Sequence, residues 1–148
     1  MSQNRQILDD IAKFAQEIVN AETAVVALAE SGGEVVYYAA AAGKHAEAIV
    51  DKKNTSANSG LCGVAFQGRV PVLVCQTEGD SRVRQDHAKA MGIKTALAVP
   101  VIYEDKLLGA LMALNRTDGS AFDEEAEKVL AGYAAEVAPV ILQFCIIS

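Results

Sequence analysis

At 148 residues the chain has the length of one domain, and its 51% hydrophobic content excludes a disordered segment. A net charge of −6, with Lys52 and Lys53 as the only adjacent basic pair, argues against binding to DNA or RNA, which requires basic surfaces. No apolar run approaches the roughly 20 residues that span a bilayer, and the acidic N-terminus lacks a signal-peptide pattern, so we expect one cytoplasmic domain over residues 1–148 without a membrane partner.

The first third of the chain predicts a helix followed by a hairpin. Apolar residues at helical spacing predict a helix over residues 4–19. Two β-rich runs, 23–30 and 34–42, are separated by a Ser-Gly-Gly turn and predict antiparallel strands. A short helix is then expected over residues 44–52.

Short elements follow in the middle of the chain. Residues 53–60 are polar and predict a loop. Ser59 is placed to cap a short helix that ends at Gly68. Residues 71–75 predict a brief apolar strand.

A second short helix is predicted before the strongest strands begin. Asp80 or Ser81 is placed to cap this helix, which runs to Met91. Gly92 then fits the left-handed residue that commonly follows a helix.

The last third of the chain predicts a hairpin and a long helix. Residues 95–103 and 107–114 are the clearest strands, joined by a tight Glu-Asp-Lys turn. Ser120 and Asp123 match a capping box that would open the final helix. Pro139 lies inside this helix and predicts a kink or a stop, because proline removes a backbone donor.

Together these elements predict an α+β fold around a central antiparallel sheet of five or six strands. Consecutive hairpins imply antiparallel pairing rather than a doubly wound parallel sheet. The first and last helices are expected to pack on one face. The short helices and loops of residues 44–94 would cover the other face.

Three segments, in this order, are similar to the GAF domain family. They read SGLCGVAFQGRVPVLV, MGIKTALAVPVIYEDKLLGALMALNR and FDEEAEKVLAGYAAEVAPVI, and the first of them begins at Ser59. The resemblance implies a pocket on one sheet face, walled by residues 54–62, 74–91 and the facing sheet side chains. Family ligands include cyclic nucleotides, bilins, haem and small metabolites, so the resemblance leaves the ligand and any cofactor open.

Several residues of these walls are candidates for ligand contact, and their polar groups are few and mixed. Backbone N–H groups of residues 60–62 would suit an anionic group. A single helical histidine such as His87 makes no site by itself and is often a surface residue. The candidates are Ser59, Cys62, Cys75, Thr77, Asp86, His87 and Met91.

Two specialised patterns of the family fit this chain poorly. Bilin-binding relatives carry a cysteine before the histidine, where this chain has Asp86 before His87. The pattern of cyclic-nucleotide-binding relatives matches loosely at Asn115, Arg116, Phe122 and Glu127, with Ala126 where an aspartate is expected. We assign these residues to the start of the last helix.

A thiol-based redox enzyme or sensor, related to free methionine sulfoxide reductase, is the alternative hypothesis. Cys62 resembles one of that family's three cysteines, whereas Lys52 and Lys53 stand near the position of another, and no cysteine shortly precedes the strand at 95–103. Cys62 would lie in the first turn of a helix, where the helix dipole lowers a thiol pKa, and Cys75 would be its partner. The competing interpretation is that Cys62 and Cys75 are both small core residues, as free cysteines usually are.

We therefore expect a non-catalytic module that senses a small ligand and transmits a signal. Apolar stripes on its terminal helices predict a homodimer, and its output would be a domain such as a histidine kinase or transcriptional regulator. A third hypothesis is an interaction module whose pocket is filled by its own side chains.

The scattered histidines and cysteines predict no metal site. The final Cys-Ile-Ile-Ser matches a prenylation box without a polybasic neighbour, so we expect no lipidation.

Overall fold

The computed structural model describes the backbone of residues 2–147 and the side chains of residues 6–57 and 59–144. The C-terminal Cys-Ile-Ile-Ser box therefore lies outside the described side chains. The elements in chain order are α1 (Ser2–Ile18), β1 (Ala21–Glu30), β2 (Val35–Gly43), α2 (Ala46–Ile49), β3 (Lys53–Thr55), α3 (Leu61–Gly68), β4 (Val72–Val74), α4 (Gln85–Met91), β5 (Ala96–Tyr103), β6 (Lys106–Arg116) and α5 (Glu124–Ile147).

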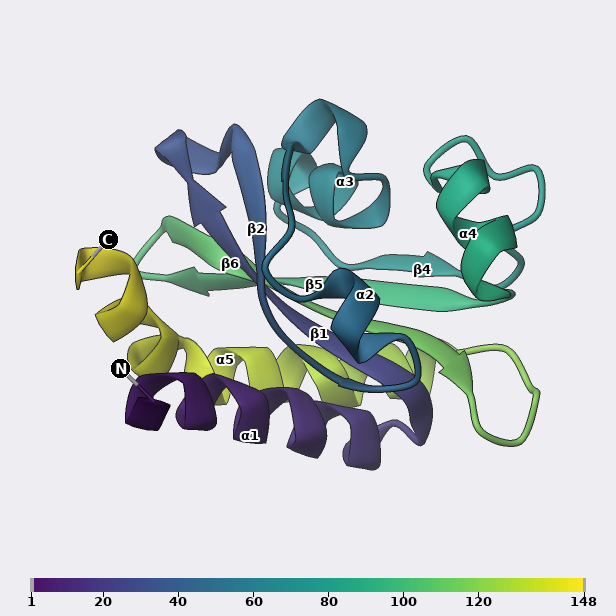
Figure 1. Ribbon diagram of the computed structural model, residues 1–148, viewed down its shortest axis with the longest axis horizontal. Helices are drawn as coiled ribbons and strands as arrows, with labels where there is room; N and C mark the ends of the chain where they lie inside the picture. Colours follow the sequence, from purple (N-terminus) through teal and green to yellow (C-terminus); the bar gives the residue numbers. More distant parts are fainter. Residues whose placement is uncertain (1, 148) are drawn as a thin grey trace.

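The described strands form one six-stranded sheet with the order β3-β2-β1-β6-β5-β4. Every neighbouring pair is antiparallel, which confirms the predicted α+β class. Helices α1 and α5 lie side by side under one face, and α2, α3 and α4 lie over the other (Figure 1). No described helix is long and apolar enough to cross a membrane.

The two faces of β5 carry side chains of different size. Successive side chains of a strand point to opposite faces. Leu97, Val99 and Val101 are fully buried against α1 and α5. Ala96 and Ala98 point to the face under the short helices. On β5 the large branched residues therefore fill the core beneath the terminal helices, and the small residues leave room on the other side.

Strand β3 is the sixth strand and lies in the segment predicted to be a loop. Its three residues, Lys53–Thr55, pair with the first residues of β2 at the sheet edge. A polar Lys-Asn-Thr strand has no apolar alternation, so pattern alone does not reveal it. The predicted helix at 44–52 is also shorter in the structure, where α2 spans only Ala46–Ile49.

The predicted caps of α3 are wrong at both ends. Gly60, not Ser59, precedes the helix, and its φ of 58° and ψ of −125° suit only glycine. The Ser59 hydroxyl instead donates to the carbonyl of Thr55 at 2.7 Å. Arg69, with a left-handed φ of 55°, follows the helix, and Gly68 belongs to its last turn.

Helix α4 begins later than predicted. Its first residue is Gln85, so neither Asp80 nor Ser81 caps it. Asp80 instead forms a bidentate ion pair with Arg82, with a shortest N···O distance of 2.7 Å. The predicted C-terminal end is confirmed, since Gly92 is left-handed with a φ of 65°.

Helix α5 also starts with a different cap from the one predicted. The Asp123 carboxylate accepts the backbone N–H of Ala126 at 2.9 Å, which makes Asp123 the N-cap. The hydroxyl of Ser120 binds Asp118 instead. Pro139 lies within α5 without stopping it, and it occupies an exposed position.

Candidate ligand pocket

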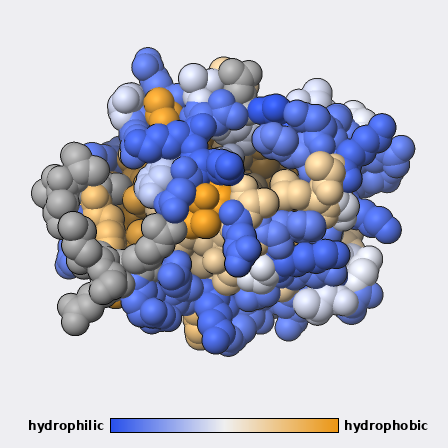
Figure 2. Space-filling model, viewed as in Figure 1, coloured by the Kyte–Doolittle hydropathy of each residue, from blue (hydrophilic) through white to orange (hydrophobic). Residues whose placement is uncertain are grey.

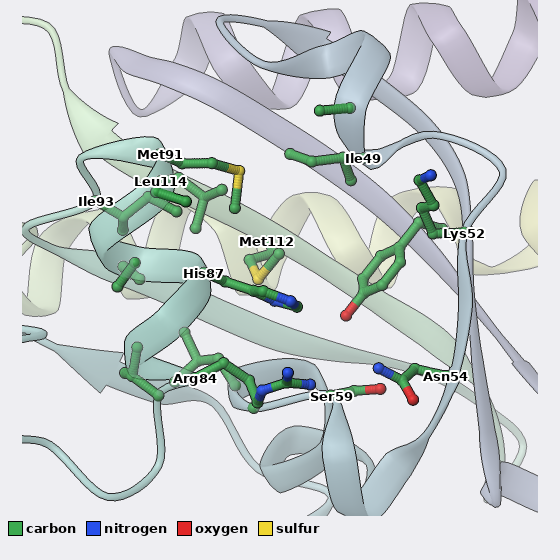
Figure 3. A pocket seen from close by; sticks show the side chains of 18 of the residues that line it. Ile49, Lys52, Asn54, Ser59, Arg84, His87, Met91, Ile93, Met112 and Leu114 are labelled. Carbon is green, nitrogen blue, oxygen red and sulfur yellow. The ribbon is translucent and has the colours of Figure 1, made fainter.

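A cavity of about 420 Å³ lies between the sheet and the cover formed by α2, α4 and the segment before α3 (Figure 3). This volume falls within the ~300–1,000 Å³ typical of small-molecule sites. Its larger apolar lining residues are Ile49, Leu61, Val83, Met91, Ile93, Met112 and Leu114, with four alanines between them. Its polar lining residues are Tyr38, Lys52, Lys53, Asn54, Ser59, Arg84 and His87. Figure 2 shows hydrophobic side chains at the surface near the middle of this face, between hydrophilic ones.

The floor of the pocket is the less bulky face of the sheet. Ala96 lines it from β5, and Met112 and Leu114 line it from β6. The pattern of alternating side chains thus explains the cavity, because a methyl group at Ala96 leaves space that a branched residue would fill.

The roof of the pocket is α4, which buries only one side chain, Ala88. This helix is held mainly through its flanking segments. The Thr77 hydroxyl donates to the carbonyl of Ile93, and the Gln85 side chain donates to the carbonyl of Thr77 at 2.8 Å. A helix with so little buried surface can move relative to the sheet more easily than α1 or α5.

Asn115 fixes the segment after α4. Its side-chain oxygen accepts the N–H of Lys94 at 2.7 Å, and its side-chain nitrogen donates to the carbonyl of Gly92 at 2.9 Å. The assignment of Asn115 to the start of the last helix is therefore wrong. Arg116 does reach that helix, through an ion pair with Asp123 at 3.3 Å.

Two glycines of the Ser-Gly-Leu-Cys-Gly motif bring the cover together. A Cβ atom on Gly63 would lie 1.8 Å from the carbonyl oxygen of Ser56, so α3 packs there only without a side chain. A Cβ atom on Gly60 would lie 3.2 Å from the backbone nitrogen of Arg84. The motif therefore determines how closely α3 approaches the preceding turn and α4.

Charged groups around the cavity are predominantly cationic, and no aspartate or glutamate is among the described lining residues. Lys53 pairs with Glu30 at 3.0 Å. Arg84 binds Asp86 with two hydrogen bonds, of 2.8 and 3.1 Å, and these bonds lower the pKa of Asp86 to about 2. Within the described residues no carboxylate pairs with Lys52.

Two hydroxyl groups complete the polar part of the pocket. Burial raises the pKa of Tyr38 well above its usual range, so this phenol stays neutral at physiological pH. Tyr38 also shares a side-chain hydrogen bond with Ser59. The pocket therefore presents neutral hydroxyls next to cationic groups.

The structure brings Ser59, His87 and Met91 together around the cavity. In Figure 3 the imidazole of His87 points toward its centre, and the Ser59 hydroxyl lies below it. Of the other candidates, Thr77 is buried and holds the loop before α4, and Asp86 is exposed beside Arg84. Contact with a ligand stays a prediction for each of them.

The two thiol candidates lie on opposite faces of the sheet. Cys62 is fully buried, and its sulfur lies 3.6 Å from the sulfur of Met112 on the pocket side. Cys75 is exposed, and its sulfur lies 3.7 Å from the carbonyl oxygen of Phe122 on the side of α5. Burial raises the pKa of Cys62 to about 12, so desolvation outweighs the helix dipole, as the interpretation of Cys62 as a small core residue predicts and the redox alternative does not. This geometry gives no support to a redox pair.

Sequence reasoning missed several residues of the pocket. The implied wall at 54–62 contains Asn54, and the wall at 74–91 contains Arg84, but neither was singled out. Lys52 was visible only as one of two adjacent basic residues. Within the described side chains, no three His, Cys, Asp or Glu residues come close enough to hold a metal ion.

Comparison with known proteins identifies the fold and the family. The GAF domain family profile matches residues 4–141, and no curated protein matches the sequence. The GAF domain of an Acinetobacter phosphoenolpyruvate-protein phosphotransferase is 20% identical with a TM-score of 0.81, over 97% of this chain and 85% of that one. Type II free methionine-R-sulfoxide reductase from Thermoplasma acidophilum is 18% identical with a TM-score of 0.77, over 97% and 95% of the two chains. The second GAF domain of DevS from Mycobacterium smegmatis is 18% identical with a TM-score of 0.75, over 96% and 95%.

At these identities the structural matches establish the fold alone, and the family profile carries the assignment. It covers the sheet, α1 and most of α5. The chain therefore belongs to the GAF domain family, whose fold is that of ligand-binding regulatory domains.

Proposed function

We propose that this protein is a non-catalytic sensor, in which a small molecule binds beneath α4 and its presence is passed to an output domain in the cytoplasm. The observation that carries the proposal is the 420 Å³ cavity between a firmly packed sheet and a lightly packed helix. A ligand that contacts both sides would stabilise one position of α4 relative to the sheet. Such differential contact is what allows binding to shift a conformational equilibrium.

The contacts that we propose combine polar groups at the rim with an apolar floor. Ser59 and His87 would orient the ligand, and Met91 would pack on it from α4. Arg84 and Lys52 join them as rim residues from either side of the opening. Cys62 and Thr77 are buried and do not line the cavity in this structure, so the proposed contacts do not depend on them.

The surroundings of the thiols support a role without catalysis. A nucleophilic cysteine requires a low pKa and access to substrate. Cys62 has neither, because it is fully buried with a raised pKa. Cys75 is exposed but lies outside the cavity lining.

A homodimer through the terminal helices would give the signal a route to an output domain such as a histidine kinase or transcriptional regulator. Ile7 and Phe14 are spaced seven residues apart on α1, and both are exposed. Val129 and Val140 are exposed on α5. Exposed apolar stripes of this kind are typical of association surfaces.

The test compares two tryptophan substitutions on the same helix. Ala90 and Lys89 are both exposed on α4, but only Ala90 lines the cavity. Native mass spectrometry and an absorption spectrum of freshly purified protein are expected to reveal a bound molecule in the wild type and in Lys89→Trp. The Ala90→Trp variant is expected to lose the bound molecule, because its indole would block the cavity.

Two results would contradict the proposal. A ligand retained by Ala90→Trp would place binding outside this pocket. A protein that carries no molecule, and whose thermal unfolding responds to no compound of a metabolite library, would favour an interaction module without a ligand.

A further inference from the structure

We propose that the ligand is an organic monoanion with a compact apolar body, such as an aryl- or alkylcarboxylate. This inference rests on the proposed sensing function and concerns the same cavity. It combines the charge at the rim with the apolar character of the floor.

The charge balance around the cavity favours a single negative charge. Three cationic side chains line the cavity, and two of them each pair with a carboxylate. Lys53 pairs with Glu30, and Arg84 pairs with Asp86. The ammonium group of Lys52 has no carboxylate partner among the described residues. One cation without a carboxylate partner matches the charge of a monoanion. A di- or triphosphate would require several such cationic groups.

Among the described lining residues, no negative charge accompanies this cation. Burial raises the pKa of the Tyr38 phenol, which therefore stays neutral, and the imidazole of His87 points into the cavity (Figure 3). No lining residue in the described part of the chain carries a carboxylate, so a ligand cation would find no partner of opposite charge. A cationic ligand would therefore bind more weakly than an anionic one of the same shape.

The rest of the lining requires an apolar body on the ligand. Met112 and Leu114 form the floor, while Ile49 and Met91 approach from α2 and α4 (Figure 3). Methionine side chains adapt to irregular shapes and pack well on aromatic rings. A bare inorganic anion or acetate would leave these surfaces in contact with water.

The experiment uses three probes of similar size that share a phenyl ring on a three-carbon chain and carry a negative, a neutral or a positive head group: 3-phenylpropionate, 3-phenyl-1-propanol and 3-phenylpropylamine. Acetate is the fourth probe. Isothermal titration calorimetry of the whole chain is expected to show the propionate binding about ten- to a hundredfold more tightly than the alcohol, as for a charge-assisted hydrogen bond. The amine is expected to bind more weakly than the alcohol, and acetate more weakly than the propionate.

Two variants link the preference to the proposed cation. Lys52→Gln is expected to remove most of the advantage of the propionate over the alcohol while the alcohol's affinity stays unchanged. Lys89→Gln, on the outer side of α4, is expected to retain that advantage. Equal affinities for propionate and alcohol, or an unchanged preference in Lys52→Gln, would overturn the assignment.

The outcomes separate this inference from the proposed function. If the alcohol or amine binds as well as the propionate and Ala90→Trp abolishes binding, the pocket is a ligand site but not one for anions. If no probe binds at millimolar concentration, the anion assignment is wrong, and the native mass spectrum decides separately whether the pocket holds a ligand.

Discussion

Cys62 and Cys75 have different surroundings, although each directly follows an apolar residue in the sequence. Cys62 lies within a cluster with Phe66 and Ala110, where water is excluded. The position of Cys62 in the first turn of α3 would by itself stabilise a thiolate. Desolvation has the larger effect, and the pKa of Cys62 rises from 9.0 to about 12.

This shift predicts a loss of stability at alkaline pH. Below pH 9 the thiol is protonated in both folded and unfolded chains, so it has no effect on the pH dependence. As the pH rises from about 9 toward 12, only the unfolded chain releases the proton, and the free energy of unfolding falls by up to roughly 1.4 kcal/mol per pH unit. Urea titrations of the wild type between pH 8 and 10.5 are expected to show this decline.

The two cysteines provide the matched comparison. Cys62→Ala is expected to be less stable at pH 8, because it leaves a small cavity, but to decline less steeply with pH. Cys75→Ala is expected to retain the wild-type slope. Equal slopes for all three proteins would show that the Cys62 thiol is not desolvated in the folded chain.

Single pocket residues were harder to predict than the fold, because a shift of one residue decides which side chain enters the cavity. Tyr37 and Tyr38 are adjacent on β2, yet Tyr38 lines the pocket and Tyr37 binds Asp51. An irregularity in the pairing of β1 with β2, between Val26 and Ala27, sets this register. A bulge of this kind leaves no clear mark in the sequence.

At the scale of elements, long periodic segments were predicted well and helix N-caps were not. The hairpin of β5 and β6 agrees with the expected strands to within two residues at each end. Caps depend on partners that the local sequence does not reveal. The Ser59 hydroxyl binds Thr55, and Asp80 binds Arg82, in place of the helix N–H groups expected.

The helical glycines Gly63 and Gly132 offer a paired test of packing. Gly63→Ala is expected to destabilise the protein by about 1–3 kcal/mol or more, because its Cβ would meet the Ser56 carbonyl at 1.8 Å. Gly132 lies on α5 with no atom within 4 Å of the added Cβ. Gly132→Ala is therefore expected to stabilise the protein by roughly 0.5–1 kcal/mol. Chemical denaturation measures both, and effects of the same sign would contradict the close packing of α3.

At the scale of the whole molecule, the terminal helices carry four of the five large apolar residues that are exposed among the described side chains. Phe14 is 48% exposed, although its ring packs against Tyr133 with centroids 4.9 Å apart. Val140 lies on α5 with 37% of its surface exposed. The N- and C-terminal stripes together would form one self-complementary surface in a twofold dimer.

Charge substitutions test this surface. Phe14→Glu and Val140→Glu are each expected to convert a dimer into a monomer of 15.6 kDa in light-scattering chromatography, since a buried, unpaired carboxylate opposes association. Val70→Glu, at a position that is 56% exposed and outside the terminal helices, is expected to leave the dimer intact. A wild-type protein that elutes as a monomer at micromolar concentration would contradict the dimer.

The unequal faces of the sheet have a consequence for how such a domain diversifies. Leu97, Val99 and Val101 pack in the core beneath the terminal helices, so substitutions there would destabilise the fold. Ala96 and Met112 face the cavity, where exchanging one side chain reshapes the binding site and leaves that lower layer untouched. The alternation of side chains along β5 and β6 thus separates residues that hold the fold together from residues that shape the cavity, which makes the scaffold easy to retarget by design.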